Sequence, residues 1–505
     1  MHKNNNNPDI RALLRDEPER VRAMVRESGR WRFDASRAPL TLGGWRARYR
    51  SGAERPLEQA VRALFAGAVV NPSEHQPALH MALRADKPED LTGRADAALV
   101  RASRERLLET AGALHAGRSP VRTLLHVGIG GSDLGPRLVA DALVNGVANG
   151  VANPGSAVRV EWLTTLDARR IGHLLDSLDP AATGLVVASK SFTTVETLTQ
   201  AAHIREWMGA DWAERAWAAT ARPERAGEFG LESNHVLAFP GWTGGRFSLW
   251  SGVGLSAAAA IGPERWNALL AGARDADRAV IDHLDRSLAL ALAHVIDVLV
   301  RECGANTLGV VSYEPRLRLL AEYLQQLIME SLGKSVDLDG QAVAGPTAPL
   351  VFGGAGTDLQ HSLFQALHQG TTRHPMLLVG SARDSAGIES WQREQLAHLL
   401  GQASVLVQGV EAESGERSLP GNNPVMPLLC RELDAPALGE LLATLEHAVY
   451  LLGVLWRINP FDQWGVEEGK RLAGQFRQAL AEGGESPDAT LSETMRWLRG
   501  EHRGE

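Results

Sequence analysis

The chain has 505 residues, of which 44% are hydrophobic and 22% charged, which is enough for two or three domains with buried cores. Its net charge of −8 excludes a strongly basic surface for nucleic acid or anionic lipid. The two cysteines, Cys303 and Cys430, lack metal-ligand spacing and are too few for a disulfide framework, so we expect a cytoplasmic protein.

The N-terminal part, 1–117, is predicted to be a helical segment. Apolar residues recur with helical spacing at 57–64 and 97–114, and the charged run at 17–26 follows the same period. The extreme N-terminus lacks the apolar core of a signal peptide, and its asparagine run is expected to be a frayed tail.

From residue 122 onward, short apolar runs alternate with glycine- or serine-rich loops and helices. Continuous apolar strands separated by helices are typical of parallel sheets covered on both faces. The predicted strands are 123–127, 159–163, 185–188 and 235–239 in the first half, and 307–312, 350–352, 376–379 and 404–407 in the second.

This rhythm predicts an α/β protein with two α/β sandwich domains, 118–275 and 276–455. A C-terminal helical segment, 456–505, follows them. The longest apolar stretches, 288–300 and 448–456, fall short of the roughly 20 residues that span a bilayer. We therefore expect neither a membrane nor a nucleic-acid partner.

A glycine-rich loop at 128–132 follows the first predicted strand and precedes a helix. It is not a dinucleotide fingerprint, because Asp133 stands where the third glycine would be, and the chain has no Walker pattern. What remains is a nest of backbone amides at a helix start, which suits a single anionic group. A tight turn without any ligand explains the loop equally well.

A second loop, 189–194, favours the ligand. It places four hydroxyls and Lys190 within six residues, just before a helix. The chain has only five lysines among 52 basic residues, so a lysine here indicates a need for a compact ammonium rather than a guanidinium. Hydroxyls, backbone amides and a helix N-terminus together hold a phosphate dianion.

These loops belong to a longer series of motifs. The runs 243–256 (TGGRFSLWSGVGLS) and 453–470, which ends FDQWGVEEGK, resemble the two signatures of the glucose-6-phosphate isomerase family. Four further runs are similar to other motifs of that family and occur in the family's order: 127–136, 189–194, 329–334 and 356–361.

The resemblance implies sugar-isomerase (SIS) domains and the reversible isomerisation of glucose 6-phosphate to fructose 6-phosphate in glycolysis and gluconeogenesis. The reaction would run through ring opening and a cis-enediol, with no cofactor and no metal. Carried over position by position, the phosphate and substrate contacts would be Gly131, Ser132, Ser189, Lys190 (partly through its backbone amide), Ser191, Thr194, Gln326 and Gln463.

The resemblance also implies the catalytic residues. Glu330 would move the proton between C2 and C1, and Arg246 would steady the enediolate with a charge that is never lost. His361 and Lys470 would open the sugar ring, with His361 donated by the neighbouring subunit of a homodimer. Without the motifs, Glu330 would be read as a solvated glutamate at a helix end. Lys334 is expected to be a structural support.

Some positions depart from the family pattern, namely Ser191, Leu327, Leu332 and Asp358. They put the breadth of substrates in question, because the two leucines make the helix beside Glu330 more apolar. Two alternatives stay open at this point. One is an isomerase for another aldose phosphate such as mannose 6-phosphate, and the other is a non-catalytic sugar-phosphate sensor, against which the intact Glu330 and His361 argue.

Overall fold

A computed structural model describes residues 8–49, 55–144, 156–383 and 388–500. The asparagine-rich tail therefore lies outside the described residues. The chain divides into two compact units, Met1–Pro460 and Phe461–Glu505, and each is considered by itself.

The first sheet of the larger unit is entirely parallel, with strand order β4-β3-β5-β6-β7. Four of its strands confirm the predicted ones, whereas β6 was not predicted, because its small residues AWAAT carry little of the β-branched signal of a strand. The strands are β3 (Thr123–Val127), β4 (Arg159–Leu163), β5 (Thr183–Ala188), β6 (Ala216–Thr220) and β7 (Val236–Ala238).

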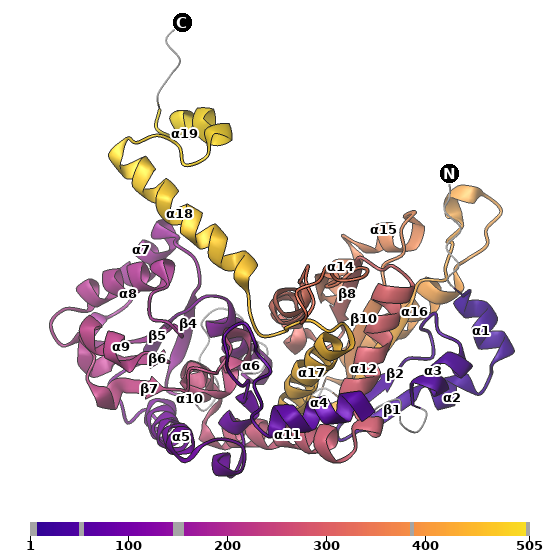
Figure 1. Cartoon of the computed structure of the whole chain (residues 1–505), viewed down its shortest axis with the longest axis horizontal. Coiled ribbons are helices and arrows are strands. Elements are labelled where there is room, and N and C mark those ends of the chain that lie inside the picture. The colour runs from indigo at the N-terminus through magenta and orange to yellow at the C-terminus, as the bar shows by residue number, and fades with distance from the viewer. Residues whose placement is uncertain (1–7, 50–54, 145–155, 384–387, 501–505) are drawn as a thin grey trace, which may run out of the picture. The chain divides into compact units, whose positions relative to one another are not determined.

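Helices cover both faces of this sheet (Figure 1). On one face lie α7 (Ala168–Asp176), α8 (Val195–Met208) and α9 (Pro223–Phe229), and on the other lie α5 (Arg94–His115), α6 (Leu134–Leu143) and α10 (Leu255–Ile261). The chain leaves β3 toward β4 and leaves β5 in the opposite direction, toward β6. The carboxyl ends of β3 and β5 thus form a topological switch point, where open parallel sheets bind their ligands.

The second sheet has the order β1-β2-β11-β10-β8-β9. Its four later strands are parallel, and the hairpin β1–β2 joins its edge antiparallel to β11. The strands are β1 (Val25–Ser28), β2 (Trp31–Asp34), β8 (Thr307–Ser312), β9 (Leu350–Ala355), β10 (Met376–Arg383) and β11 (Val425–Glu432).

Two sequence predictions are wrong in this sheet. The N-terminal segment is not purely helical, since β1 and β2 turn at Gly29 and bury Trp31 and Phe33 on one face of the strand. The predicted strand 404–407 lies within α16 (Glu389–Gln408), where these apolar residues form the buried stripe of a helix. A short apolar run does not distinguish the two structures by its period.

Three further helices accompany the second sheet. They are α11 (Pro263–Asp282), α12 (Leu288–Asp297) and α17 (Ala435–Leu455). Among the described residues, α17 alone is long and apolar enough to cross a membrane. From the sequence, only its last part is recognised, in the apolar stretch 448–456. Because α17 is buried inside the protein and carries Glu440, Glu446 and His447, it is a core helix.

The charged side chains of α17 belong to a buried cluster. The Arg84 guanidinium donates two hydrogen bonds to Asp277, at 2.9 and 2.7 Å, and a third to Glu446 at 2.5 Å. Trp250 donates its indole N–H to the other oxygen of Glu446 at 2.8 Å, and Arg84 lies over the Trp250 ring. His447 contacts Asp277 at 2.7 Å. The cluster therefore connects four separate parts of the chain.

The remaining α-helices of this unit are short. They are α1 (Ile10–Asp16), α2 (Arg20–Ala23), α3 (Leu42–Arg48), α4 (Arg55–Phe65), α13 (Leu320–Leu324), α14 (Gly356–Gln360) and α15 (Phe364–Gln369). The smaller unit consists of α18 (Trp464–Glu482), α19 (Ser492–Leu498) and a single 3-10 turn between them, which confirms the helical C-terminal prediction. The predicted boundary between two sandwich domains near residue 275 stays a prediction.

Candidate active site

The glycine loop after β3 is built so that only glycine fits. The 3-10 turn η3 (Gly130–Ser132) begins with a left-handed residue, since Gly130 has φ +59°. A Cβ on Gly131 would lie 2.1 Å from the Gly245 carbonyl oxygen, so the loop packs directly against the backbone that precedes Arg246. The predicted loop thus exists and adjoins a predicted catalytic residue.

The end of this loop is anchored by His126, a buried residue of β3. Its Nε2 donates to the Ser132 carbonyl at 2.8 Å, which leaves Nδ1 to accept from the Ser256 hydroxyl, also at 2.8 Å. Burial lowers the pKa of His126 to about 4, so the ring is neutral. The sequence alone gives His126 no role. A histidine inside an otherwise mainly apolar strand could have indicated that its ring binds a specific partner.

The hydroxyl-rich loop follows β5 and contains paired hydroxyls. Ser189 Oγ accepts from the Phe192 amide and lies 3.1 Å from Thr194 Oγ1, while Ser191 Oγ lies 2.7 Å from Thr193 Oγ1. Phe192 is buried with φ +51°, a conformation that is uncommon for a bulky residue and marks a strained turn. Both predicted loops therefore follow the carboxyl ends of neighbouring strands, β3 and β5, at the switch point.

Lys190 lies in this second loop with its side chain half-buried. Burial lowers the pKa of Lys190 below its ordinary value; Arg246 and Arg222 add to the effect, whereas Glu74 opposes it. A half-buried ammonium in these surroundings is suited to an anionic ligand.

Arg246 belongs to the 3-10 helix η7 (Gly245–Trp250), and its side chain is buried. Its Nε donates to Ser331 Oγ at 2.6 Å, and a second nitrogen donates to the Pro460 carbonyl at 2.5 Å. A third nitrogen lies 3.6 Å from Glu330 Oε2. The guanidinium is thus fixed in one orientation beside the predicted base.

Glu330 ends the π-helical segment η12 (Gln325–Glu330), which continues α13. Its side chain is 19% exposed, so it is partly sheltered but reachable from solvent. Lys334 donates to the Glu330 backbone carbonyl at 2.7 Å, a contact that suits the predicted supporting role of this lysine. Single π-turns inside α-helices are frequent at functional sites.

Gln326 lies one turn before Glu330 and reaches the glycine loop. Its Nε2 lies 2.8 Å from the position that a Cβ on Gly130 would occupy. The structure therefore gathers the glycine loop, Gln326, Glu330 and Arg246 in one place. Leu327 and Leu332 are fully buried, so these two departures from the family pattern fill the core behind Glu330.

For His361 the structure shows an exposed side chain that is not bonded to this group. It lies exposed at the end of α14, and its side chain makes no hydrogen bond or ion pair with any described residue. A donated histidine would be expected to look this way in a single subunit, but its position in an assembly stays a prediction.

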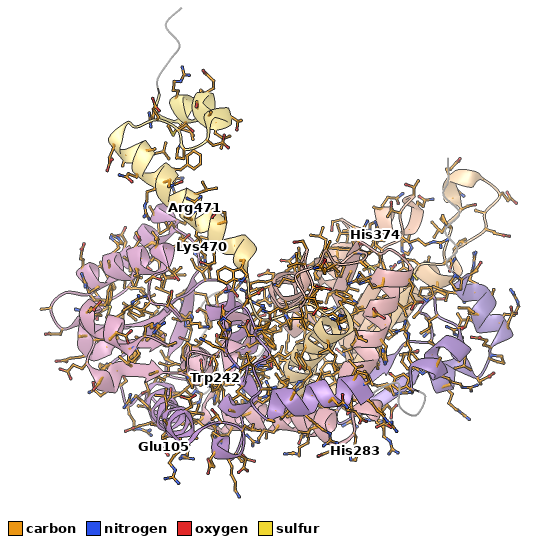
Figure 2. The ribbon with its side chains drawn as sticks, in the orientation of Figure 1. Glu105, Trp242, His283, His374, Lys470 and Arg471 are labelled. Carbon is orange, nitrogen blue, oxygen red and sulfur yellow. The ribbon has the colours of Figure 1, made fainter. Side chains whose placement is uncertain are left out.

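Lys470 and Gln463 belong to the smaller unit, and their position relative to Glu330 stays a prediction. Because α18 begins at Trp464, Lys470 lies in the second turn of this helix rather than at its start. Its ammonium is exposed on α18, next to Arg471 (Figure 2), and pairs with Glu467 at 2.9 Å. Gln463 immediately precedes the helix.

The second sheet has a separate polar cavity of about 930 Å³. It is lined by Thr307, Pro375 and Pro424, which lie at the amino ends of β8, β10 and β11, and by His374 (Figure 2). Parallel sheets bind ligands at the opposite, carboxyl ends of their strands. This cavity is therefore not part of the candidate active site.

Two loops rich in backbone amides and hydroxyls, beside a carboxylate with a fixed cation, are typical of enzymes that move a proton within an anionic substrate. The family described as phosphoglucose isomerase matches residues 46–493. The chain belongs to this family.

Individual relatives agree with the family. A glucose-6-phosphate isomerase of Xanthomonas axonopodis pv. citri is 40% identical over 497 residues, which cover 97% of this chain and 96% of the relative. A protein of the same name from Stenotrophomonas maltophilia is 41% identical, covering 93% and 92% of the two chains. The crystal structure of a glucose-6-phosphate isomerase from Chlamydia trachomatis superposes with a TM-score of 0.86 at 28% identity and covers 98% of this chain and 97% of its own.

Proposed function

We propose that this chain interconverts glucose 6-phosphate and fructose 6-phosphate by proton transfer through a cis-enediol, with Glu330 as the base. It is an aldose–ketose isomerase, in keeping with its family and with relatives that bear this activity in their names. The observation that carries the mechanism is the buried Arg246 guanidinium, held 3.6 Å from the Glu330 carboxylate beside the glycine loop.

The phosphate of the substrate binds at the carboxyl ends of β3 and β5. Backbone amides at Gly131 and Ser132 face it from one loop, and the hydroxyls of Ser189, Ser191 and Thr194 with the Lys190 ammonium face it from the other. These donors are neutral or positive, so they offset the charge of a dianion without a metal ion. Gln326 and Gln463 contact the sugar.

Proton transfer takes place at the other end of the open-chain sugar. The Glu330 carboxylate removes the proton from C2 of glucose 6-phosphate, and the electron pair forms the C1–C2 double bond while the carbonyl oxygen gains negative charge. Arg246 stabilises that oxygen, because a fixed guanidinium costs no reorganisation when the charge appears. The hydroxyl proton on O2 is then exchanged for one on O1, so that the negative charge lies on O2. As Glu330 returns the proton to C1, the electron pair on O2 forms the C2 carbonyl, and the product is fructose 6-phosphate.

Ring opening precedes this transfer and uses His361 and Lys470. One of them takes the proton of the ring hydroxyl while the other supports the ring oxygen. In our proposal His361 comes from the neighbouring subunit, so the homodimer is the active form. The reaction takes place in the cytoplasm.

Isotope exchange tests the mechanism. Purified protein incubated with fructose 6-phosphate in deuterated water should yield glucose 6-phosphate labelled at C2, at a rate that EDTA does not change. Glu330→Gln keeps the shape of the side chain but removes the base, so turnover should fall by roughly 10²- to 10⁴-fold. The control Glu389→Gln, at an exposed position in the first turn of α16, should keep the label and most of the rate. Near-normal turnover in Glu330→Gln would show that the base is misassigned. Product without label would show that the transferred hydrogen does not exchange with solvent, which contradicts transfer through a solvent-reachable Glu330.

A further inference from the structure

Asp133 stands at the start of α6, directly after the glycine loop, but it does not cap the helix. An aspartate at this position ordinarily accepts a hydrogen bond from the first turn. Here its Oδ2 accepts from Arg137 Nε at 3.0 Å, and its buried Oδ1 has no partner among the described residues. The side chain is 3% exposed, so a carboxylate is held next to the loop and away from water.

This placement is costly for a negative charge. Burial raises the pKa of Asp133 to about 6, against the opposing effect of Arg137 and in the same direction as the Glu322 carboxylate. A phosphate dianion bound at Gly131 and Ser132 would lie close to this carboxylate in a region of low dielectric constant. Like charges repel strongly under those conditions.

Arg137 also connects the loop to the helix of the proposed base. Its second nitrogen donates to Glu322 Oε2 at 3.0 Å, and Glu322 lies in α13, four residues before Gln326. One guanidinium therefore binds the residue after the glycine loop and the helix that continues to Glu330. The Arg137 side chain is 26% exposed, so its removal leaves no large cavity.

We propose that Arg137 is a positioning residue for the phosphate-binding loop: it neutralises Asp133 and holds it away from the site that receives the sugar phosphate. This inference rests on the proposed binding of phosphate at Gly131 and Ser132. Arg137 touches neither the substrate nor the reacting carbons, so it acts on substrate binding rather than on proton transfer.

The same helix carries a matched ion pair that lies farther from the loop. Asp141 pairs with Arg318, and the two side chains are 7% and 28% exposed, close to the 3% and 26% of the first pair. Burial raises the pKa of Asp141 to about 6 as well. Asp141 lies two helical turns beyond Asp133, so breaking its ion pair removes a similar interaction without changing the charge beside the loop.

Steady-state kinetics with fructose 6-phosphate distinguish an effect of Arg137 on substrate binding from an effect on proton transfer. Arg137→Gln should raise KM by about tenfold while kcat stays within about threefold. Adding Asp133→Asn to that variant should restore KM to near the wild-type value, because the unpaired charge is gone. Arg137→Lys should keep most of the affinity, and Arg318→Gln should leave KM unchanged. Circular dichroism and the melting temperature of each variant check that it is folded.

Several results would overturn the proposal: a normal KM in Arg137→Gln, a rise in KM that Asp133→Asn does not reverse, or an equal rise in Arg318→Gln. Ser191→Ala, which removes a hydroxyl proposed to face the phosphate, distinguishes this failure from failure of the proposed function. If Ser191→Ala raises KM and Arg137→Gln does not, the phosphate site stands and the role of Arg137 is wrong. If Ser191→Ala leaves KM unchanged, both are wrong.

Discussion

Lys190 illustrates how one side chain in this site responds to its surroundings. Burial, with the nearby positive charges of Arg246 and Arg222, lowers its pKa from the ordinary value of 10.5. A lysine whose pKa is lowered loses its proton at a lower pH than a solvated one, so its attraction for phosphate is complete only below the shifted pKa. The substrate phosphate remains a dianion throughout this range.

We therefore expect KM for fructose 6-phosphate to rise at alkaline pH, starting below the pH at which an ordinary lysine titrates. Lys190→Ala should raise KM by about tenfold at neutral pH and abolish the alkaline rise, with a smaller effect on kcat. Lys190→Arg is the control, because a guanidinium stays charged and should give a KM that is flat in this range. An equal loss of kcat at saturation would mean that Lys190 takes part in the chemistry.

The residues of the site divide into those that a local motif reveals and those that only the fold reveals. Gly131 and Arg246 stand within recognisable runs, and their neighbours in sequence determine their geometry. Ser331 and His126 could not be assigned in this way, because their partners are distant in the sequence. Ser331 accepts a hydrogen bond from Arg246, and His126 binds the Ser256 hydroxyl beside β3.

At the scale of helices and strands, the buried cluster around Arg84 joins α11, α17 and η7. The positive charge of Arg84 and its hydrogen bonds hold the pKa of Asp277 below its usual range, against the effect of burial. Trp250, which lies on Arg84 and bonds to Glu446, is in the same 3-10 helix as Arg246. The cluster thus supports the helix that carries the fixed cation of the site.

Removing Arg84 should be strongly destabilising. Arg84→Met keeps much of the volume but leaves the Asp277 and Glu446 carboxylates buried without their cation, which costs about 3–5 kcal/mol. The free energy of unfolding in urea, followed by circular dichroism, measures the loss. Arg286→Met is the control, because this arginine is 83% exposed and should change stability by no more than about 0.5 kcal/mol. Similar urea midpoints for the two variants would contradict a structural role for the cluster.

The strands differ in how well the sequence predicts them. Strands β3, β4 and β8 were predicted with their exact bounds, because each is a short run bounded by turn residues, and β3 and β8 are mainly apolar. The hairpin β1–β2 was missed, since its alternate residues are charged and its strand character depends on pairing with β11. The run 404–407 was misassigned because its apolar residues are the inner face of α16, which only the longer helical context shows.

At the scale of the whole molecule, the order of the motifs in the sequence does not determine which of them come together in space. The switch point between β3 and β5 follows from strand order and brings together the two loops proposed to bind phosphate. Lys470 and Gln463 lie in a separate compact unit, and His361 lies exposed on its own chain. Whether these residues complete the site from within one chain or across subunits is therefore a question for experiment.

Mixing two inactive variants tests that assembly. If His361 crosses to the neighbouring subunit, a dimer of one Glu330→Gln chain and one His361→Ala chain contains one site with both mutations and one site with neither. Equal amounts unfolded and refolded together should then recover roughly a quarter of the wild-type activity, since half of the randomly formed dimers are mixed and each has one intact site. Each variant refolded alone is the control and should remain inactive. If both residues act within one chain, every site in the mixture carries one mutation and no activity returns.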